Sequence, residues 1–177
     1  MIASQSIPAV VLASITVYTG VYHLLLSSRR HRKRTDLLFA LTCLSMGAYD
    51  IFCGGLYSST GLAAGMMWQR AQMFSLAFVG VTFVWFCSDY TAAVSRRFRW
   101  LSTVYFLVMG AIMGIAPDAM VFHVDRSVLR TFRFLGSAVS YHEAEFSALA
   151  LLLHGLSILA FCYMLIVALR FYRREDR

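Results

Sequence analysis

Five long apolar stretches alternate with short polar segments along the chain. Each is close to the roughly 20 residues that a helix needs to cross a hydrocarbon core of about 30 Å. The fourth is the shortest, and Pro117 ends it because proline has no backbone N–H to continue a helix. The pattern predicts five membrane-spanning helices. They are expected near residues 7–27, 37–57, 68–91, 100–116 and 146–169.

The composition fits a multispan membrane protein. Hydrophobic residues make up 59% of the 177 residues, charged residues only 14%, and the mean hydropathy is +0.66. An ordinary soluble domain holds about 25% charged residues. We therefore expect residues 1–177 to form one all-α, polytopic helical bundle. No Lys or Arg precedes the first stretch, so it lacks the basic region of a cleaved signal peptide and is expected to remain.

The basic residues determine the predicted orientation. The formal net charge is +7, and most of the 16 Lys and Arg residues flank apolar stretches. Short loops rich in Lys and Arg stay in the cytoplasm, which places the N-terminus outside and the C-terminus inside. Their position favours anionic lipid headgroups over nucleic acid as partners. The topology determinants are Arg29, Arg30, Arg32, Lys33, Arg34, Arg96, Arg97 and Arg99.

Two charged residues lie near the outer ends of the second and third stretches. Asp50 lies within the second stretch, where an unpaired carboxylate is costly. Arg70 opens the third stretch on the same side, and an antiparallel helix pair would bring the two level. We expect an Asp50–Arg70 ion pair. It would either fix the register of the two helices or line a polar pocket that opens outward, with Trp68 and Gln72 at its mouth.

The segment 117–145 is the longest stretch outside the predicted spans, and two structures suit it. Arg126, Arg130 and Arg133 recur at helical spacing, with apolar residues on the opposite side, which favours an amphipathic helix on the outer interface. The run RTFRF also alternates, and Gly136 followed by serine suits the turn of a short hairpin. The helix is the favoured prediction.

No catalytic or cofactor motif occurs in the sequence, so we predict neither an enzyme nor a resident cofactor or metal. The four cysteines lie within spans and lack metal-ligand spacing. His23 and His154 lie at different expected depths, which disfavours a shared haem. Gly110 and Gly114 form a face of small residues that allows close helix approach and is compatible with a homodimer.

Most of residues 15–174 resembles a known family. The likeness lies in the run TDLLFALTCLSMGAYDIFCGGLYSS and, after a short loop, in MMWQRAQMFSLAFVGVTFVWFCSDYTA, where Trp68, Arg70 and Gln72 open the helix. It continues in VDRSVLRTFRFLGSAVSYHEAEF and a helix that ends in RFYRR. These segments resemble the seven-helix membrane sensor region at the amino terminus of many bacterial histidine kinases. Similar regions precede PAS domains and diguanylate cyclases.

The resemblance implies a sensor module in the bacterial inner membrane. Such a module would bind a small outer or intramembrane ligand and pass a helix rearrangement to a cytoplasmic kinase or cyclase output domain, in cis or in trans. The family is expected to have two further helices before that domain, so a chain ending at Arg177 corresponds to a fragment, a truncated reading frame or a stand-alone module. The alternative is a small transporter or membrane-enzyme subunit that uses Asp50 and the intramembrane histidines.

Overall fold

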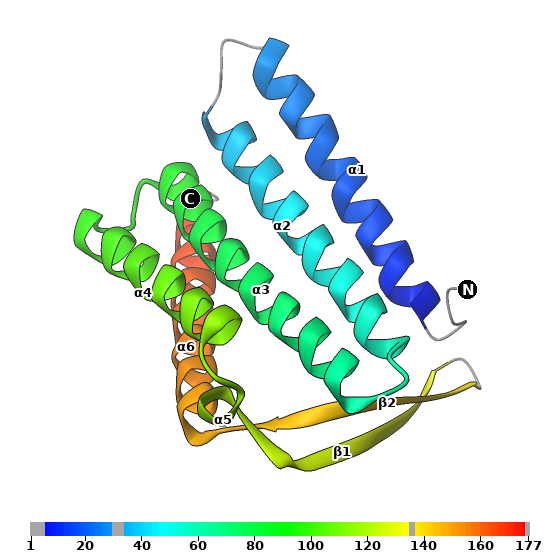
Figure 1. Cartoon of the computed structure of the whole chain (residues 1–177). Coiled ribbons are helices and arrows are strands. Elements are labelled where there is room, and N and C mark those ends of the chain that lie inside the picture. The colour runs from blue at the N-terminus through cyan, green and yellow to red at the C-terminus, as the bar shows by residue number, and fades with distance from the viewer. Residues whose placement is uncertain (1–5, 30–33, 135–136, 176–177) are drawn as a thin grey trace.

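The computed structural model describes residues 6–29, 34–134 and 137–175, and it is a helical bundle closed at one end by a β-hairpin (Figure 1). Within these residues, five helices are long and apolar enough to cross a membrane. The predicted helices are thus confirmed, with shifted bounds. In chain order the elements are α1 (Ile7–Arg29), α2 (Arg34–Tyr57), α3 (Leu62–Thr91), α4 (Arg96–Ile115), α5 (Asp118–Val121), β1 (Phe122–Phe134), β2 (Ser137–Phe146) and α6 (Ala148–Glu175).

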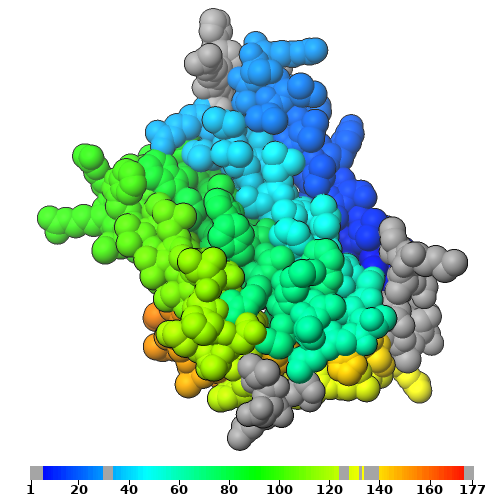
Figure 2. Space-filling view, in the orientation of Figure 1, coloured from blue at the N-terminus to red at the C-terminus, as the bar shows by residue number. Residues whose placement is uncertain are grey.

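The helices α1 to α4 lie side by side in chain order, and α6 lies behind α3 and α4 (Figure 1). The hairpin crosses the end of the bundle where α3 begins, which we call the hairpin end. The opposite end holds the start of α2, the connection from α3 to α4 and the end of α6; we call it the arginine end. In the space-filling view, α1 to α4 form one continuous face with the hairpin along its lower edge (Figure 2).

The central helix is α3, which contacts α2, α4, β2 and α6. Its 30 residues span about 45 Å, more than the roughly 30 Å of a hydrocarbon core. Its first turns reach the hairpin. Gly80 on α3 lies under the Phe106 ring of α4, where an added Cβ would meet ring carbons at 2.4 Å. Gly55 on α2 receives the Trp68 ring of α3 equally closely.

The segment after α4 corrects the sequence prediction. The favoured amphipathic helix over 117–145 is wrong, because these residues form the short helix α5 and then two antiparallel strands. The fold is therefore mostly helical rather than all-α. Alternating Val, Thr and Phe residues favour a strand. In the hairpin, the backbone N–H and C=O groups of each strand pair with those of the other strand. The spacing of the arginines did not decide the structure.

Cross-strand contacts hold the hairpin together. The register pairs Arg130 with Tyr141 and Thr131 with Ser140, whose hydroxyls lie 3.0 Å apart. Arg130 Nε donates to Glu143 Oε2 at 3.1 Å in a diagonal ion pair. Burial raises the pKa of the Tyr141 hydroxyl, and the Glu143 carboxylate adds to this effect, so the phenol stays protonated at neutral pH.

The last helix, α6, packs more loosely than α3 does. Of its most apolar window only 17% is buried inside the chain, against 50% for α3. Its contact with α4 includes aromatic pairs, such as Phe98 with Tyr163, and a polar contact in which the Tyr105 hydroxyl donates to the carbonyl of Leu153 and lies 2.9 Å from Ser157 Oγ. Exposed leucines and isoleucines along the rest of α6 suit contact with lipid chains.

Replacing Gly80 with alanine should destabilise the bundle by about 1–3 kcal/mol, because the new methyl group overlaps the Phe106 ring. The matched control is Gly155→Ala on α6, where no atom lies within 4 Å of the added Cβ. Alanine favours helix over glycine by about 1 kcal/mol, so the control should be neutral or stabilising. Thermal unfolding followed by circular dichroism in detergent micelles measures both. Equal melting temperatures for the two variants would contradict the packing described.

Candidate functional site

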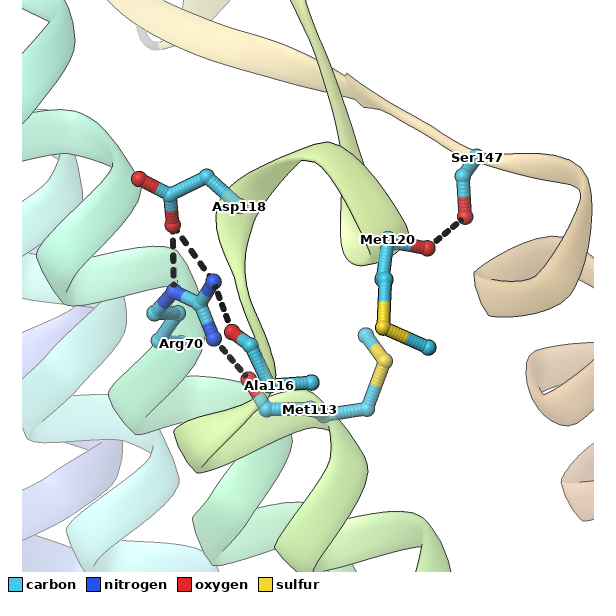
Figure 3. A network of polar contacts seen from close by, with 6 residues as sticks. All are labelled: Arg70, Met113, Ala116, Asp118, Met120 and Ser147. Carbon is cyan, nitrogen blue, oxygen red and sulfur yellow. Dashed lines mark hydrogen bonds and ion pairs between the residues drawn. The ribbon is translucent and has the colours of Figure 1, made fainter.

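The guanidinium group of Arg70 organises the hairpin end of the bundle (Figure 3). Its Nε and Nη2 both donate to one carboxylate oxygen of Asp118, with Nε at 3.0 Å. Nη1 donates to the carbonyl of Met113 at 3.0 Å, and Nη2 to that of Ala116 at 2.7 Å. Because these carbonyls belong to the last turn of α4, Arg70 caps that helix from α3. The Phe122 ring lies 5.3 Å from the guanidinium carbon.

The short helix α5 is held on a second side by the start of α6. The Ser147 hydroxyl donates to the carbonyl of Met120 at 2.6 Å, and the Ser147 N–H donates to the carbonyl of Val121 at 2.8 Å. The same hydroxyl accepts from the Ala150 N–H at 3.2 Å, which makes Ser147 the N-cap of α6. Figure 3 shows the hydrogen bond from Ser147 to Met120, with Arg70 on one side of α5 and Ser147 on the other.

The predicted Asp50–Arg70 ion pair is absent from the described residues, where Arg70 pairs with Asp118. The two residues lie on different sides of the α2–α3 contact. Asp50 follows Gly47 by one turn and precedes Gly54 by one turn, and both glycines touch α1. Arg70 instead lies on the side of α3 that packs against α4. The rotation of each helix about its own axis was not predicted.

Asp50 has no cation within ion-pair distance among the described residues. It is half-buried, and it lies two turns from the end of α2. A carboxylate at this depth without a cation is uncommon in membrane helices, where charged groups are usually paired or functional. Asp50 therefore stays a candidate for ligand recognition, independent of Arg70.

Trp68 and Gln72, predicted at a pocket mouth, lie within the α2–α3 contact. The Trp68 ring fills the space above Gly55 and lies 6.2 Å from the Phe52 ring. Gln72 is buried. The sequence analysis therefore selected residues of the interface between these helices, but it predicted Trp68 and Gln72 at the mouth of a pocket.

Two shallow clefts open beside Arg70. One, of about 450 Å³, is lined by Arg70, Asp118 and residues of the first turns of α3, including Leu62 and Met66. The other, of about 370 Å³, lies between α3 and α4 and includes Phe74. The Asp118 side chain is half-exposed in this region, whereas that of Arg70 is 16% exposed. A small polar molecule could reach the Asp118 carboxylate here without unfolding any element.

Gln69 joins α3 to the hairpin, a role that the sequence did not predict. Its side-chain amide donates to the Ala144 carbonyl at 3.1 Å and accepts from the Ala144 N–H at 3.2 Å. The amide thus pairs with β2 as a neighbouring strand would. Gly65, one turn earlier, allows the approach, since an added Cβ would lie 2.4 Å from the His142 carbonyl oxygen. Gln69 is 1% exposed, so these bonds are shielded from water.

The predicted topology determinants that the structure describes gather at the arginine end. Arg29 ends α1 and Arg34 begins α2. Asp89 at the end of α3 accepts a hydrogen bond from Thr35 and lies 3.8 Å from Arg34. Three determinants, Arg30, Arg32 and Lys33, lie outside the described residues, and the other three, Arg96, Arg97 and Arg99, lie in the first turn of α4.

The histidines of the alternative hypothesis lie far from one another and from Asp50. His23 Nδ1 lies 3.4 Å from Asp36 between α1 and α2, near the arginine end. His154 stacks on Phe146 at the hairpin end of α6. Within the described residues, no three His, Cys, Asp or Glu side chains are close enough to hold a metal ion. A proton path through these groups has no support in their arrangement.

Asp118 was missed, although a signal for it exists in the sequence. In an antiparallel pair, residues equally distant from the connecting loop meet, as Ser88 meets Arg99 and Ala77 meets Gly110. Counting outward from the loop between α3 and α4 places Arg70 beside residues 116–118. The acid that follows Pro117 was therefore the expected partner. Gln69 has no such signal, because its partner is a backbone.

Comparisons with family models, with curated proteins and with solved structures find no match to this chain. The resemblance to sensor regions of histidine kinases therefore stays a prediction.

Double-mutant cycles should separate the observed pair from the predicted one. Arg70→Gln should cost about 2–3 kcal/mol of stability, since it leaves two helix-end carbonyls without their donor. Asp118→Asn should cost less than about 1 kcal/mol, because that side chain is half-exposed. In thermal unfolding, Arg70→Gln and Asp118→Asn should be non-additive, whereas Arg70→Gln and Asp50→Asn should add. Coupling between Asp50 and Arg70 instead would contradict the arrangement described.

Proposed function

We propose that this chain is the input module of a signal-transduction system in the bacterial inner membrane, with its hairpin end outside and its arginine end in the cytoplasm. The module recognises a small ligand and passes a helix displacement to a kinase or cyclase output domain, in cis or in trans. It performs no catalysis itself. The orientation follows from the arginines at the ends of α1, α2 and α4.

The observation that carries this proposal is the direct connection from the hairpin to α6. A single residue, Ser147, separates β2 from α6, so a displacement of the hairpin acts on the first turn of a helix that reaches the opposite end (Figure 1). Only 17% of the most apolar window of α6 is buried inside the chain, against 50% for α3, so a displacement of α6 would break fewer contacts within the chain than one of α3.

The hairpin has a defined docked state from which it can be released. Gln69 pairs with Ala144, and Gly65 lets the β2 backbone lie against α3. A ligand that binds beside Asp118 or Asp50 and prefers either the docked or the released hairpin would shift the balance between two positions of α6. Only a difference in affinity for the two states produces a signal, however tightly the ligand binds.

Loosening the hairpin should move the distant end of α6 even without a ligand. Gln69→Met keeps the volume of the side chain but removes both bonds to Ala144, so trypsin should cleave after the exposed Arg130 about tenfold faster. Spin labels at Ala93→Cys and Arg173→Cys, in a background without native cysteines, report the position of α6. Their distance distribution should broaden or shift in the Gln69→Met protein.

The control is Thr82→Val, also on α3, whose hydroxyl bonds only to carbonyls of its own helix. It should change neither cleavage nor the distance distribution. Faster cleavage with an unchanged distribution would show that the hairpin and α6 are not coupled, and the proposed mechanism would be wrong.

Asp50→Asn tests the second recognition element. Because no cation among the described residues pairs with Asp50, the variant should accumulate and melt like the native protein. A fusion of the chain to a histidine-kinase output domain should then lose its response to the growth condition that activates the native fusion. Failure of the variant to accumulate would assign Asp50 a structural role instead.

A further inference from the structure

A second polar cluster lies at the arginine end, around the Trp85 ring of α3. The guanidinium carbon of Arg99 lies 4.5 Å from the centroid of this ring, and that of Arg34 lies 5.1 Å from it. The indole N–H donates to Thr103 Oγ1 at 2.8 Å, which fixes the ring against α4. Two cations from different helices are thus held beside one aromatic side chain.

Most donors of these two guanidinium groups have no acceptor within the described part of the chain. Arg99 Nη1 donates to Ser88 Oγ at 3.3 Å, but the buried Arg99 Nε has no partner. Arg34 forms an ion pair with the Asp89 carboxylate, but its Nε lies 3.8 Å from Oδ1, which is beyond hydrogen-bond distance. An arginine carries five N–H donors in a planar fork that matches the oxygens of a phosphate. The cluster therefore suits a ligand with several negatively charged oxygens.

The start of α4 adds positive charge at the same place. Arg96 and Arg97 are exposed in its first turn, which contains no acidic residue. The N-terminus of a helix is itself partially positive, so basic residues there are unfavourable unless an anion is bound. Ser95 satisfies one backbone donor by accepting from the Phe98 N–H at 3.2 Å. Long side chains project from this corner, the green region at the left of Figure 2.

The contrast with Arg70 shows that an arginine in this fold can be satisfied internally. Arg70 donates to a carboxylate and to two helix-end carbonyls. Arg34 and Arg99 have no comparable set of acceptors among the described residues.

An apolar strip on α4 continues from the cluster toward the middle of the bundle. Trp100, whose ring lies 5.3 Å from that of Trp85, is followed at helical spacing by Val104 and Leu107. All three side chains are at least half-exposed, at 50%, 58% and 51%. A ligand with a phosphate at one end and an apolar chain at the other matches this order of groups.

We propose that the cluster of Arg34, Trp85, Arg96 and Arg99 is a binding site for the phosphate of an anionic membrane lipid, whose acyl chain lies along Trp100, Val104 and Leu107. Arg34 and Arg99 bind phosphate oxygens with their unused donors, and Arg96 neutralises the remaining charge. The site rests on the membrane placement proposed above and not on the sensing role. It would fix the arginine ends of α2, α3 and α4 to the cytoplasmic leaflet.

Trp85 and Trp100 serve as the reporters for a direct binding test. The chain has three tryptophans, so Trp68→Phe leaves only these two, and both lie at the proposed site. Purified protein in uncharged detergent is titrated with dihexanoylphosphatidylglycerol while its fluorescence is recorded. We expect a saturable change that Arg99→Gln and Arg34→Gln each weaken about tenfold. The exposed Arg34 carries the test if the Arg99 variant does not fold.

Arg173→Gln is the matched control, because it removes the same charge from the same end of the bundle, on the exposed side of α6. It should change the affinity less than twofold. If Arg173→Gln and Arg34→Gln lowered the affinity for dihexanoylphosphatidylglycerol equally, the effect would be general electrostatic attraction, and the proposed site would be wrong. Equal affinity for dihexanoylphosphatidylcholine, or for inorganic phosphate, would overturn an anionic lipid as the ligand. None of these outcomes depends on the coupling of the hairpin to α6.

Discussion

Close approach of the central helix α3 to its neighbours is the constraint on which the rest of the structure depends. Inside a bilayer, apolar side chains gain little by leaving lipid, so helices associate through tight van der Waals packing and hydrogen bonds. Gly80 and Gly110 bring α3 and α4 together, and Gly55 admits Trp68 between α2 and α3. From the sequence, the Gly110–Gly114 face was compatible with a homodimer. In the structure this face packs within the chain, against Ala77 and Phe74.

This packing decides which polar groups can meet. With α2 and α4 on different sides of α3, a residue on α3 can face only one of them. Arg70 faces α4, so it caps that helix and holds Asp118 of α5. Asp50 lies toward α1 and is left without a cation among the described residues. The separation of Asp50 from Arg70 follows from the faces of α2 and α3 on which these residues lie.

The helices were predictable because their signal is local and strong. Apolar stretches of about 20 residues and the clusters of arginine define five spans without any knowledge of contacts. The hairpin was harder, since Arg126, Arg130 and Arg133 fit a helical period as well as the Val, Thr and Phe residues fit a strand. The bond between Gln69 and Ala144 was not predictable, because a backbone partner leaves no mark in the sequence. The position of Asp118 was predictable by counting from the α3–α4 loop.

The two ends of the bundle differ in how fully their arginines are satisfied, and this difference assigns them different roles. At the hairpin end, Arg70 uses internal acceptors, so its removal affects the fold before any ligand. At the arginine end, Arg34 and Arg99 keep unused donors within the described residues, so an external anion completes them. A helix that moves relative to a bundle needs the rest of the bundle fixed. Lipid bound at α2, α3 and α4 would supply that fixed frame, and α6, which lacks such a cluster, would be left to move.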